Sequence, residues 1–260
     1  MATLHRVTIT GADDSVAPEA LVELSREFPF VEWGILAADE GRVEPRFPEM
    51  AWIARLKSAF AAAATRPSLA LHLCGRWVGQ LLVGKVTFPA ELIEDFDRVQ
   101  LNFREKRSRV ELDELVRAMR GMAGRQWIVP ISASRPNLTF EALLAEREKA
   151  RPIVAVPLYD SSGGIGKLPD AWPAPRYATA PHLLNEQGYA GGLGPMNLTD
   201  EIPKILSVAG AARVWIDMET RVRSDDDRLF DLSKVRTCLE AARPHVAVDG
   251  NAAPSRSRGD

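Results

Sequence analysis

The chain has 260 residues, of which 46% are hydrophobic and 26% charged, and its formal net charge is -2 at pH 7. This length suits one large domain, and a charge balance without a basic surplus argues against a nucleic-acid-binding groove. The two cysteines are too few for a disulfide framework and lack metal-site spacing, so we expect reduced thiols in a cytoplasmic protein.

The first residues, Met-Ala-Thr-Leu-His-Arg, lack the apolar stretch of a secretory signal, and no apolar run approaches the roughly 18 residues of a membrane span. Apolar runs of strand length then alternate with stretches of helical periodicity. The predicted strands cover residues 6–10, 31–36, 69–74, 97–103, 127–131, 153–160, 189–192 and 214–218. The predicted helices include residues 18–27, 48–65, 110–121, 140–150, 201–209 and 232–242.

Strands that alternate with helices along a whole chain indicate a parallel sheet covered by helices. An open doubly wound sheet would satisfy the same alternation, but eight strands favour closure. We therefore predict an α/β fold of the (β/α)₈ TIM-barrel type as a single domain over residues 1–243. Residues 244–260 lack apolar periodicity, and we predict a disordered tail there.

Alternate side chains of each strand face the interior of such a barrel. This periodicity sends His72, Gln100 and Asp217 inward, whereas the leucines of residues 69–73 face the helices. Polar side chains gather where the strands end, at Thr10, Cys74, Asn102, Asp160 and Glu219. Active sites of these barrels are built at that face, so we expect the functional residues there.

Glycine-rich turns follow the sixth and seventh predicted strands, at residues 161–166 and 190–194. Backbone N–H groups in such turns can cradle an anion, because glycine allows the close approach that a side chain would block. We therefore predict anion binding at Gly163, Gly164, Gly166, Gly191 and Gly192. The competing interpretation is that these glycines only turn the chain.

The order of these motifs resembles phosphoribosylanthranilate isomerase, the barrel enzyme that converts an aminoaldose phosphate to an aminoketose phosphate by an Amadori rearrangement. The most specific similarity lies in the sixth and seventh turns, Asp-Ser-Ser-Gly-Gly-Ile-Gly (160–166) and Tyr-Ala-Gly-Gly-Leu-Gly-Pro-Met-Asn-Leu (189–198). Weaker similarities are Thr-Ile-Thr-Gly (8–11), Glu-Pro-Arg-Phe (44–47), Val-Gln-Leu-Asn (99–102) and the segment 216–223.

The resemblance implies that Asp160 is the general acid and that Arg46 clamps a substrate carboxylate. It also implies substrate contacts at Gln100, Asn102 and Asp217. In that family the general base is a cysteine at the position of Thr10, and a hydroxyl group cannot remove a proton unaided. We expect either loss of the family reaction or a substitute base.

Two groups could replace the missing cysteine: the Cys74 thiol, and the Glu219 carboxylate as a partner of Asp160. The alternative for Cys74 is a small buried core residue, and His72 below it fits a core histidine. Glu219 also opposes phosphate binding nearby unless Arg221 or Arg223 neutralises it.

These observations predict an isomerase-like enzyme of the Amadori type, acting by acid/base chemistry on a small sugar-phosphate-like or carboxylated molecule. Two alternatives stay open: a ligand-binding barrel without catalysis, and a different reaction on an unphosphorylated substrate that uses Asp160 and Glu219. We expect no cofactor, no metal, no nucleic acid and no membrane contact. The substrate, the pathway and the oligomeric state stay open.

Overall fold

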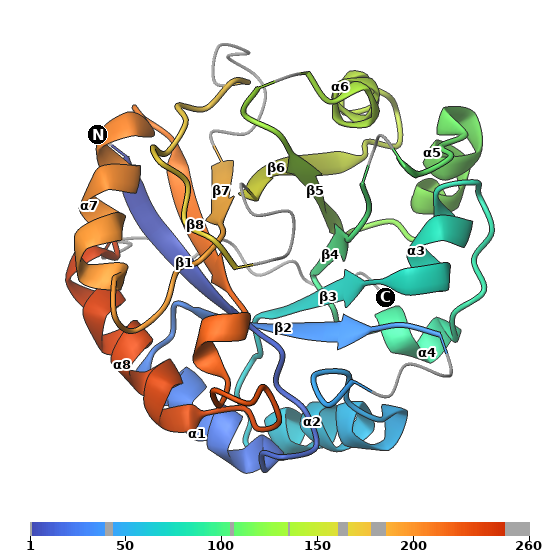
Figure 1. The fold of residues 1–260 in the computed structure, drawn as a ribbon. Coiled ribbons are helices and arrows are strands. Elements are labelled where there is room, and N and C mark those ends of the chain that lie inside the picture. Colours follow the sequence, from blue (N-terminus) through green and yellow to red (C-terminus); the bar gives the residue numbers. More distant parts are fainter. Residues whose placement is uncertain are drawn as a thin grey trace.

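The computed structural model describes residues 2–39, 44–104, 107–134, 136–160, 166–177 and 186–247. Eight parallel strands pair in chain order and close into a barrel, because β8 pairs with both β7 and β1 (Figure 1). The predicted fold class is thereby confirmed. The strands are β1 (Thr3–Thr10), β2 (Val31–Ala37), β3 (Leu69–Leu73), β4 (Arg98–Leu101), β5 (Gln126–Ile131), β6 (Val154–Asp160), β7 (Glu186–Ala190) and β8 (Arg213–Met218).

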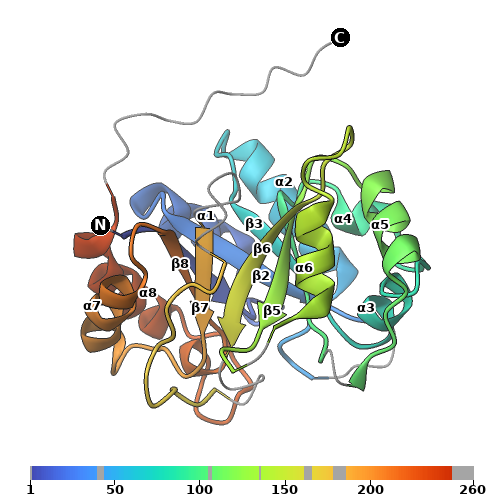
Figure 2. The same cartoon turned by 90° about the horizontal axis from the view of Figure 1, so that it is seen from above.

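Helices surround the barrel, with α7 and α8 on one flank and α5 and α6 on the other (Figures 1 and 2). They are α1 (Pro18–Glu27), α2 (Met50–Ala62), α3 (Gly75–Leu81), α4 (Ala90–Ile93), α5 (Leu112–Gly121), α6 (Leu138–Ala145), α7 (Leu198–Val208) and α8 (Leu232–Ala242), with short 3₁₀ turns η2 (Thr220–Val222) and η3 (Arg243–His245). The sequence did not predict α3 and α4, which have only 7 and 4 residues and no full period of apolar positions. Within the described part of the chain, no helix has the length and apolarity needed to cross a bilayer.

Two apolar layers result from the alternation of side chains along the strands. The helix-facing leucines Leu69, Leu71 and Leu73 belong to the large core cluster between the strands and the helices. A second, smaller cluster fills the barrel itself and contains Ala70, Ile128, Val156, Leu158 and Trp215. The inward and outward faces of β3 are therefore those that the sequence predicts.

A buried ion pair lies inside the barrel beneath this inner cluster. Arg98 Nη1 lies 2.7 Å from Glu32 Oε1, and both side chains are at most 3% exposed. The Arg98 guanidinium also stacks on the Trp215 ring at 4.3 Å, and the Thr8 hydroxyl donates to Glu32 at 2.8 Å. Although burial raises the pKa of Glu32, Arg98 and Arg6 lower it below its usual value. Removing one partner would leave the other charge buried and unpaired, which would lower the free energy of unfolding by about 3–5 kcal/mol.

After α8, beyond the predicted domain boundary, the chain makes further contacts with the first strand of the barrel. The turn η3 ends at His245, Val246 forms a parallel bridge with Leu4, and Ala247 N donates to Leu4 O at 2.8 Å. These contacts lie at the N-terminal end of the strands, opposite the predicted site. The remaining residues of the predicted tail, 248–260, lie outside the described residues.

Candidate functional site

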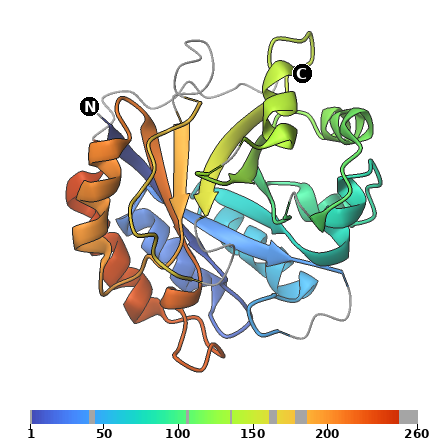
Figure 3. The same ribbon diagram turned by 45° about the horizontal axis from the view of Figure 1, so that its top comes forward.

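A cavity of about 510 Å³ opens at the C-terminal ends of the strands, a volume suited to a small molecule. In Figure 3 the arrowheads of the yellow-green β6 and the orange β7 lie together at one end of the barrel. The cavity lining includes most of the predicted site residues: Arg46, Cys74, Gln100, Asn102, Asp160, Gly166, Gly191, Gly192, Asp217 and Glu219. Gly163 and Gly164 lie outside the described residues, and the structure places the remaining one, Thr10, beneath the cavity.

The turn after β7 places two glycines beside the cavity. Gly191 and Gly192 both have positive φ, +116° and +69°, and their N–H groups donate no hydrogen bond to another described residue. A Cβ on Gly192 would overlap the backbone N of Leu168, so the turns after β6 and β7 pack backbone to backbone. These glycines therefore allow the two turns to approach each other, and their N–H groups have no acceptor among the described residues.

Arg221, in the turn η2 after β8, adds a positive charge to the same side of the cavity. Its side chain lies across Gly194, where a Cβ would approach Arg221 Cδ to 3.0 Å. Arg221 is exposed, and among the described residues it forms no ion pair. Gly191 and Gly192 after β7 and Arg221 after β8 thus line a common volume, and Gly166 lines it as well.

Asp217 is a buried acid that lines the cavity and has a strongly raised pKa. It is 8% exposed, and its Oδ1 accepts a hydrogen bond of 2.7 Å from the hydroxyl of Thr10, which is fully buried. Burial raises the pKa of Asp217 to about 8, against the opposing hydrogen bond from Thr10, and the charges of Glu219, Glu32 and Asp160 add to the rise. Asp217 is therefore a neutral carboxylic acid at neutral pH.

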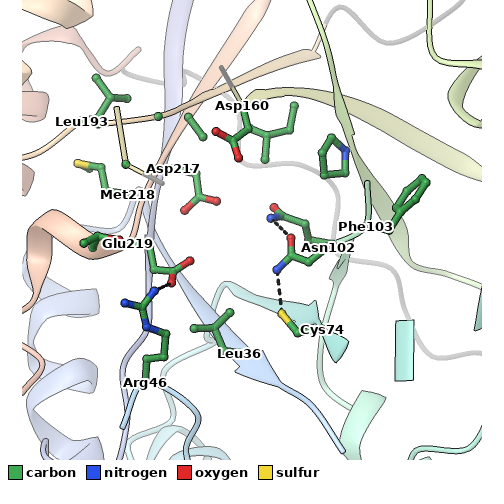
Figure 4. Close-up of a pocket in the computed structure, with 18 of the residues that line it drawn as sticks. Leu36, Arg46, Cys74, Asn102, Phe103, Asp160, Leu193, Asp217, Met218 and Glu219 are labelled. Atoms are coloured by element: carbon green, nitrogen blue, oxygen red, sulfur yellow. Dashed lines mark hydrogen bonds and ion pairs between the residues drawn. The ribbon is translucent and has the colours of Figure 1, made fainter. Parts of the chain in front are cut away.

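Asp160 ends β6 and lies beside Asp217 at the cavity (Figure 4). It is half-buried, whereas Asp217 is buried, so one carboxyl group meets solvent at the mouth and the other lies at the base. Two acids of different exposure in one cavity can hold different protonation states, which is the arrangement that acid/base catalysis needs.

Arg46 lines the cavity, but its guanidinium is already engaged by two acids. Nη1 forms an ion pair with Glu219 (Figure 4), and Nη2 forms one with Asp227. Burial raises the pKa of Glu219 and Arg46 lowers it, with a net shift upward. The main neutralising partner of Glu219 is therefore Arg46, which the sequence did not suggest; Arg223, one of the two arginines that it did suggest, makes a smaller contribution of the same sign.

Arg223 plays a different part, since it is fully buried below the β8 turn. Its Nη2 lies 2.7 Å from Asp13 Oδ2, its Nε lies 2.8 Å from Asp227 Oδ1, and its Nη1 donates to the carbonyl oxygen of Gly11. This side chain joins the turn after β1 to the turn after β8 and supports the wall of the cavity that carries Glu219. Arg223 is not among the residues that line the cavity.

Hydrogen bonds connect Cys74, at the end of β3, to two amide side chains of the neighbouring strand β4. Asn102 Nδ2 lies 3.1 Å from Cys74 Sγ, and Gln100 Nε2 donates to Asn102 Oδ1 at 2.7 Å. Gln100 Oε1 is buried and has no hydrogen-bond partner among the described residues. That oxygen offers an acceptor to a ligand with an O–H or N–H group.

His72 lies below this wall, inside the barrel, and is fully buried. Burial lowers its pKa to about 4, against the opposing charge of Glu32, so the imidazole is neutral at neutral pH. It does not line the cavity, which fits the core interpretation. Among the described residues, no group of three or more His, Cys, Asp or Glu side chains could hold a metal ion.

Fold and site together define a (β/α)₈ barrel with a polar pocket of carboxyl groups and backbone donors at the C-terminal ends of its strands. No protein-family model matches the chain, and no curated protein sequence is similar to it. Among solved structures, it is similar to a phosphoribosyl anthranilate isomerase from Thermococcus kodakaraensis, at 15% identity and a TM-score of 0.48, over 92% of this chain and 99% of that one.

The chain is also similar to a Rubisco-like protein from Rhodopseudomonas palustris, at 12% identity and a TM-score of 0.39, over 96% of this chain and 65% of that one. The first similarity is to the family that the sequence motifs resemble. The strand pairing defines the fold, and any chemistry depends on the residues of the pocket.

Four features of the site were not apparent in the sequence. The neutral state of Asp217 and the Arg46–Glu219 pair arise from residues far apart in the chain. The close approach of the β7 turn to residues 166–168 depends on the packing of two loops. Gly34, an inward-facing glycine in the middle of β2, could have been singled out, because glycine inside a strand often marks a close approach.

Proposed function

We propose that this barrel is an acid/base isomerase for a small sugar-like molecule that carries a phosphate or carboxylate group. The observation that carries the proposal is the pair of carboxyl groups in the cavity, Asp217 buried and neutral and Asp160 half-buried. In an aldose-to-ketose rearrangement, one group must protonate a substrate oxygen while another removes a proton from the neighbouring carbon. Asp217 is suited to the first role and Asp160 to the second.

The anionic group of the substrate would bind at the β7 and β8 turns. Gly191 and Gly192 offer N–H donors there, and Arg221 offers a guanidinium. Gln100 Oε1 would accept a hydrogen bond from a substrate hydroxyl or amine at the other end of the cavity. The ligand class is therefore a molecule with an anion at one end and hydrogen-bond donors at the other.

A second candidate is a barrel that binds such a ligand without transforming it. It is favoured by Thr10, because the hydroxyl at the position of the family's cysteine base is buried and committed to Asp217. The third interpretation, catalysis on an unphosphorylated substrate by Asp160 and Glu219, is less well supported, because Glu219 is held by Arg46.

Anion binding is tested by thermal unfolding with inorganic phosphate, ribose 5-phosphate and ribose. A ligand that binds the folded state raises Tm, so phosphate and ribose 5-phosphate should stabilise the protein and ribose should not. Arg221→Ala should weaken this effect, whereas Arg228→Ala, an exposed arginine that does not line the cavity, should leave it intact. Stabilisation by ribose alone would favour the third interpretation.

Catalysis is tested by deuterium exchange at C2 of ribose 5-phosphate in D₂O, followed by NMR. The wild type should exchange this proton, and Asp160→Asn should abolish the exchange. Complementation of a strain that lacks the tryptophan-pathway isomerase tests the specific Amadori reaction. Binding of ribose 5-phosphate without exchange or complementation would contradict the catalytic proposal and support the ligand-binding barrel.

A further inference from the structure

We infer that Thr10 is a positioning residue that orients the Asp217 carboxyl group so that Oδ2 carries the proton and meets the ligand. This inference rests on the proposed function, since it assigns the donor atom of the proposed acid. Thr10, which stands at the position of the family's cysteine base, would thus act through Asp217 and not on the substrate itself.

The hydrogen bond itself sets the proton's position. The Thr10 hydroxyl donates to Asp217 Oδ1 over 2.7 Å, between two buried residues. A neutral carboxyl group has one carbonyl oxygen, which is the stronger acceptor, and one hydroxyl oxygen, which is the donor. Oδ1 acts as the carbonyl oxygen, and the acid proton is then on Oδ2.

The reverse arrangement, in which Asp217 donates to Thr10, would leave the Thr10 proton without an acceptor. Among the described residues, the Thr10 hydroxyl forms no hydrogen bond other than the one with Asp217. A buried hydroxyl without a partner is costly, so donation from Thr10 is the favoured direction. One donor, on Asp217, is then left for a ligand in the cavity.

Gly34 supplies the space that this geometry needs. It is the register partner of Thr10 on β2, and a Cβ at this position would overlap Thr10 Oγ1. The same Cβ would lie 3.0 Å from His72 Nε2, so it could not shift towards β3 either. A side chain at residue 34 would therefore push the Thr10 hydroxyl away from Asp217.

The side chains around Asp217 determine how much the hydrogen bond from Thr10 contributes to its pKa. Glu219 at the end of β8, Glu32 on β2 and Asp160 on β6 all disfavour its ionised form. Arg46 is paired with Glu219, and Arg98 with Glu32, which leaves Thr10 as the main group that favours the carboxylate. Loss of the Thr10 hydroxyl should accordingly raise the pKa of Asp217 further.

The test compares Thr10→Val, Thr10→Ser and Gly34→Ala by ¹³C NMR titration of the Asp217 carboxyl carbon, assigned with Asp217→Asn. Thr10→Val and Gly34→Ala should raise this pKa by about one unit relative to the wild type, whereas Thr10→Ser should restore the wild-type value. Thr10→Val should also slow deuterium exchange of ribose 5-phosphate, mainly through kcat, with a pH profile displaced in the same direction.

The carboxyl titration needs no substrate, so its result stands even if ribose 5-phosphate is not transformed. A Thr10→Val protein that loses stability while Asp217 titrates as in the wild type would overturn the inference, because it would leave Thr10 a purely structural role. If Thr10→Val does not fold, Gly34→Ala and Thr10→Ser decide the question: an unchanged pKa in Gly34→Ala, or a raised one in Thr10→Ser, would equally overturn it.

Discussion

Replacing Asp217 by asparagine should stabilise the protein at neutral pH. The asparagine amide can accept the Thr10 hydrogen bond at Oδ1 and donate from the position of Oδ2, as the neutral acid does. The wild-type carboxyl group has an ordinary pKa of 3.8 in the unfolded chain and about 8 in the folded protein. Between these values the folded state binds more protons than the unfolded state, so wild-type stability falls as the pH rises.

The size of the effect follows from this difference in pKa. One bound proton corresponds to a slope of about 1.4 kcal/mol per pH unit, so the penalty at pH 7 approaches about 4 kcal/mol and is absent well below pH 4. Asp217→Asn should remove this penalty. The difference in unfolding free energy between variant and wild type should therefore grow by about 3 kcal/mol between pH 5 and 7.

Urea denaturation at about pH 5, 6 and 7, followed by tryptophan fluorescence, measures this difference directly. Asp200→Asn, an exposed acid at the start of α7, is the matched control and should show no such trend. A difference between Asp217→Asn and the wild type that is independent of pH would refute the argument, as would a variant less stable than the wild type at pH 7.

Two further predictions concern packing and thiol accessibility. Gly188→Ala should destabilise the barrel by about 1–3 kcal/mol in urea denaturation, because the added Cβ overlaps the Trp215 ring. The control is Gly79→Ala in helix α3, where a Cβ meets open space, and this variant should be neutral or stabilising. Equal stabilities of the two variants would contradict the packing of Gly188 against Trp215. Iodoacetamide at neutral pH should modify Cys74, which lines the cavity, before Cys238, because burial raises the pKa of Cys238 to about 12. Peptide mass spectrometry measures the order of modification in the native protein, and earlier modification of Cys238 would contradict the prediction.

The barrel could be predicted from the sequence because its information is local. Each strand is a short apolar run bounded by turn residues, and the alternation within residues 69–74 already separates the helix-facing leucines from the inward-facing positions. The glycine-rich turns are also local features of the sequence, and Gly166, Gly191 and Gly192 lie at the end of the barrel where the cavity opens. Short helices such as α3 carry too few residues for a period to be recognised.

The electrostatics of the site could not be predicted in this way. Whether Arg46 meets a ligand or another side chain depends on Glu219 and Asp227, which lie more than 170 residues away in the chain. The protonation state of Asp217 depends on its depth in the cavity and on acids from other strands. In the sequence, Thr10 stands at the position of the family's cysteine base. Its hydrogen bond to Asp217 is seen only in the structure.

The proposed function requires a neutral carboxyl group that can donate a proton in the cavity. Titration of Asp217 in the wild-type protein is the most direct test of this requirement. Its ¹³C carboxyl resonance, identified by its loss in Asp217→Asn, should titrate with a pKa of about 8. Titration near the ordinary value of 3.8 would mean that Asp217 is ionised at neutral pH and cannot be the acid of the proposed reaction.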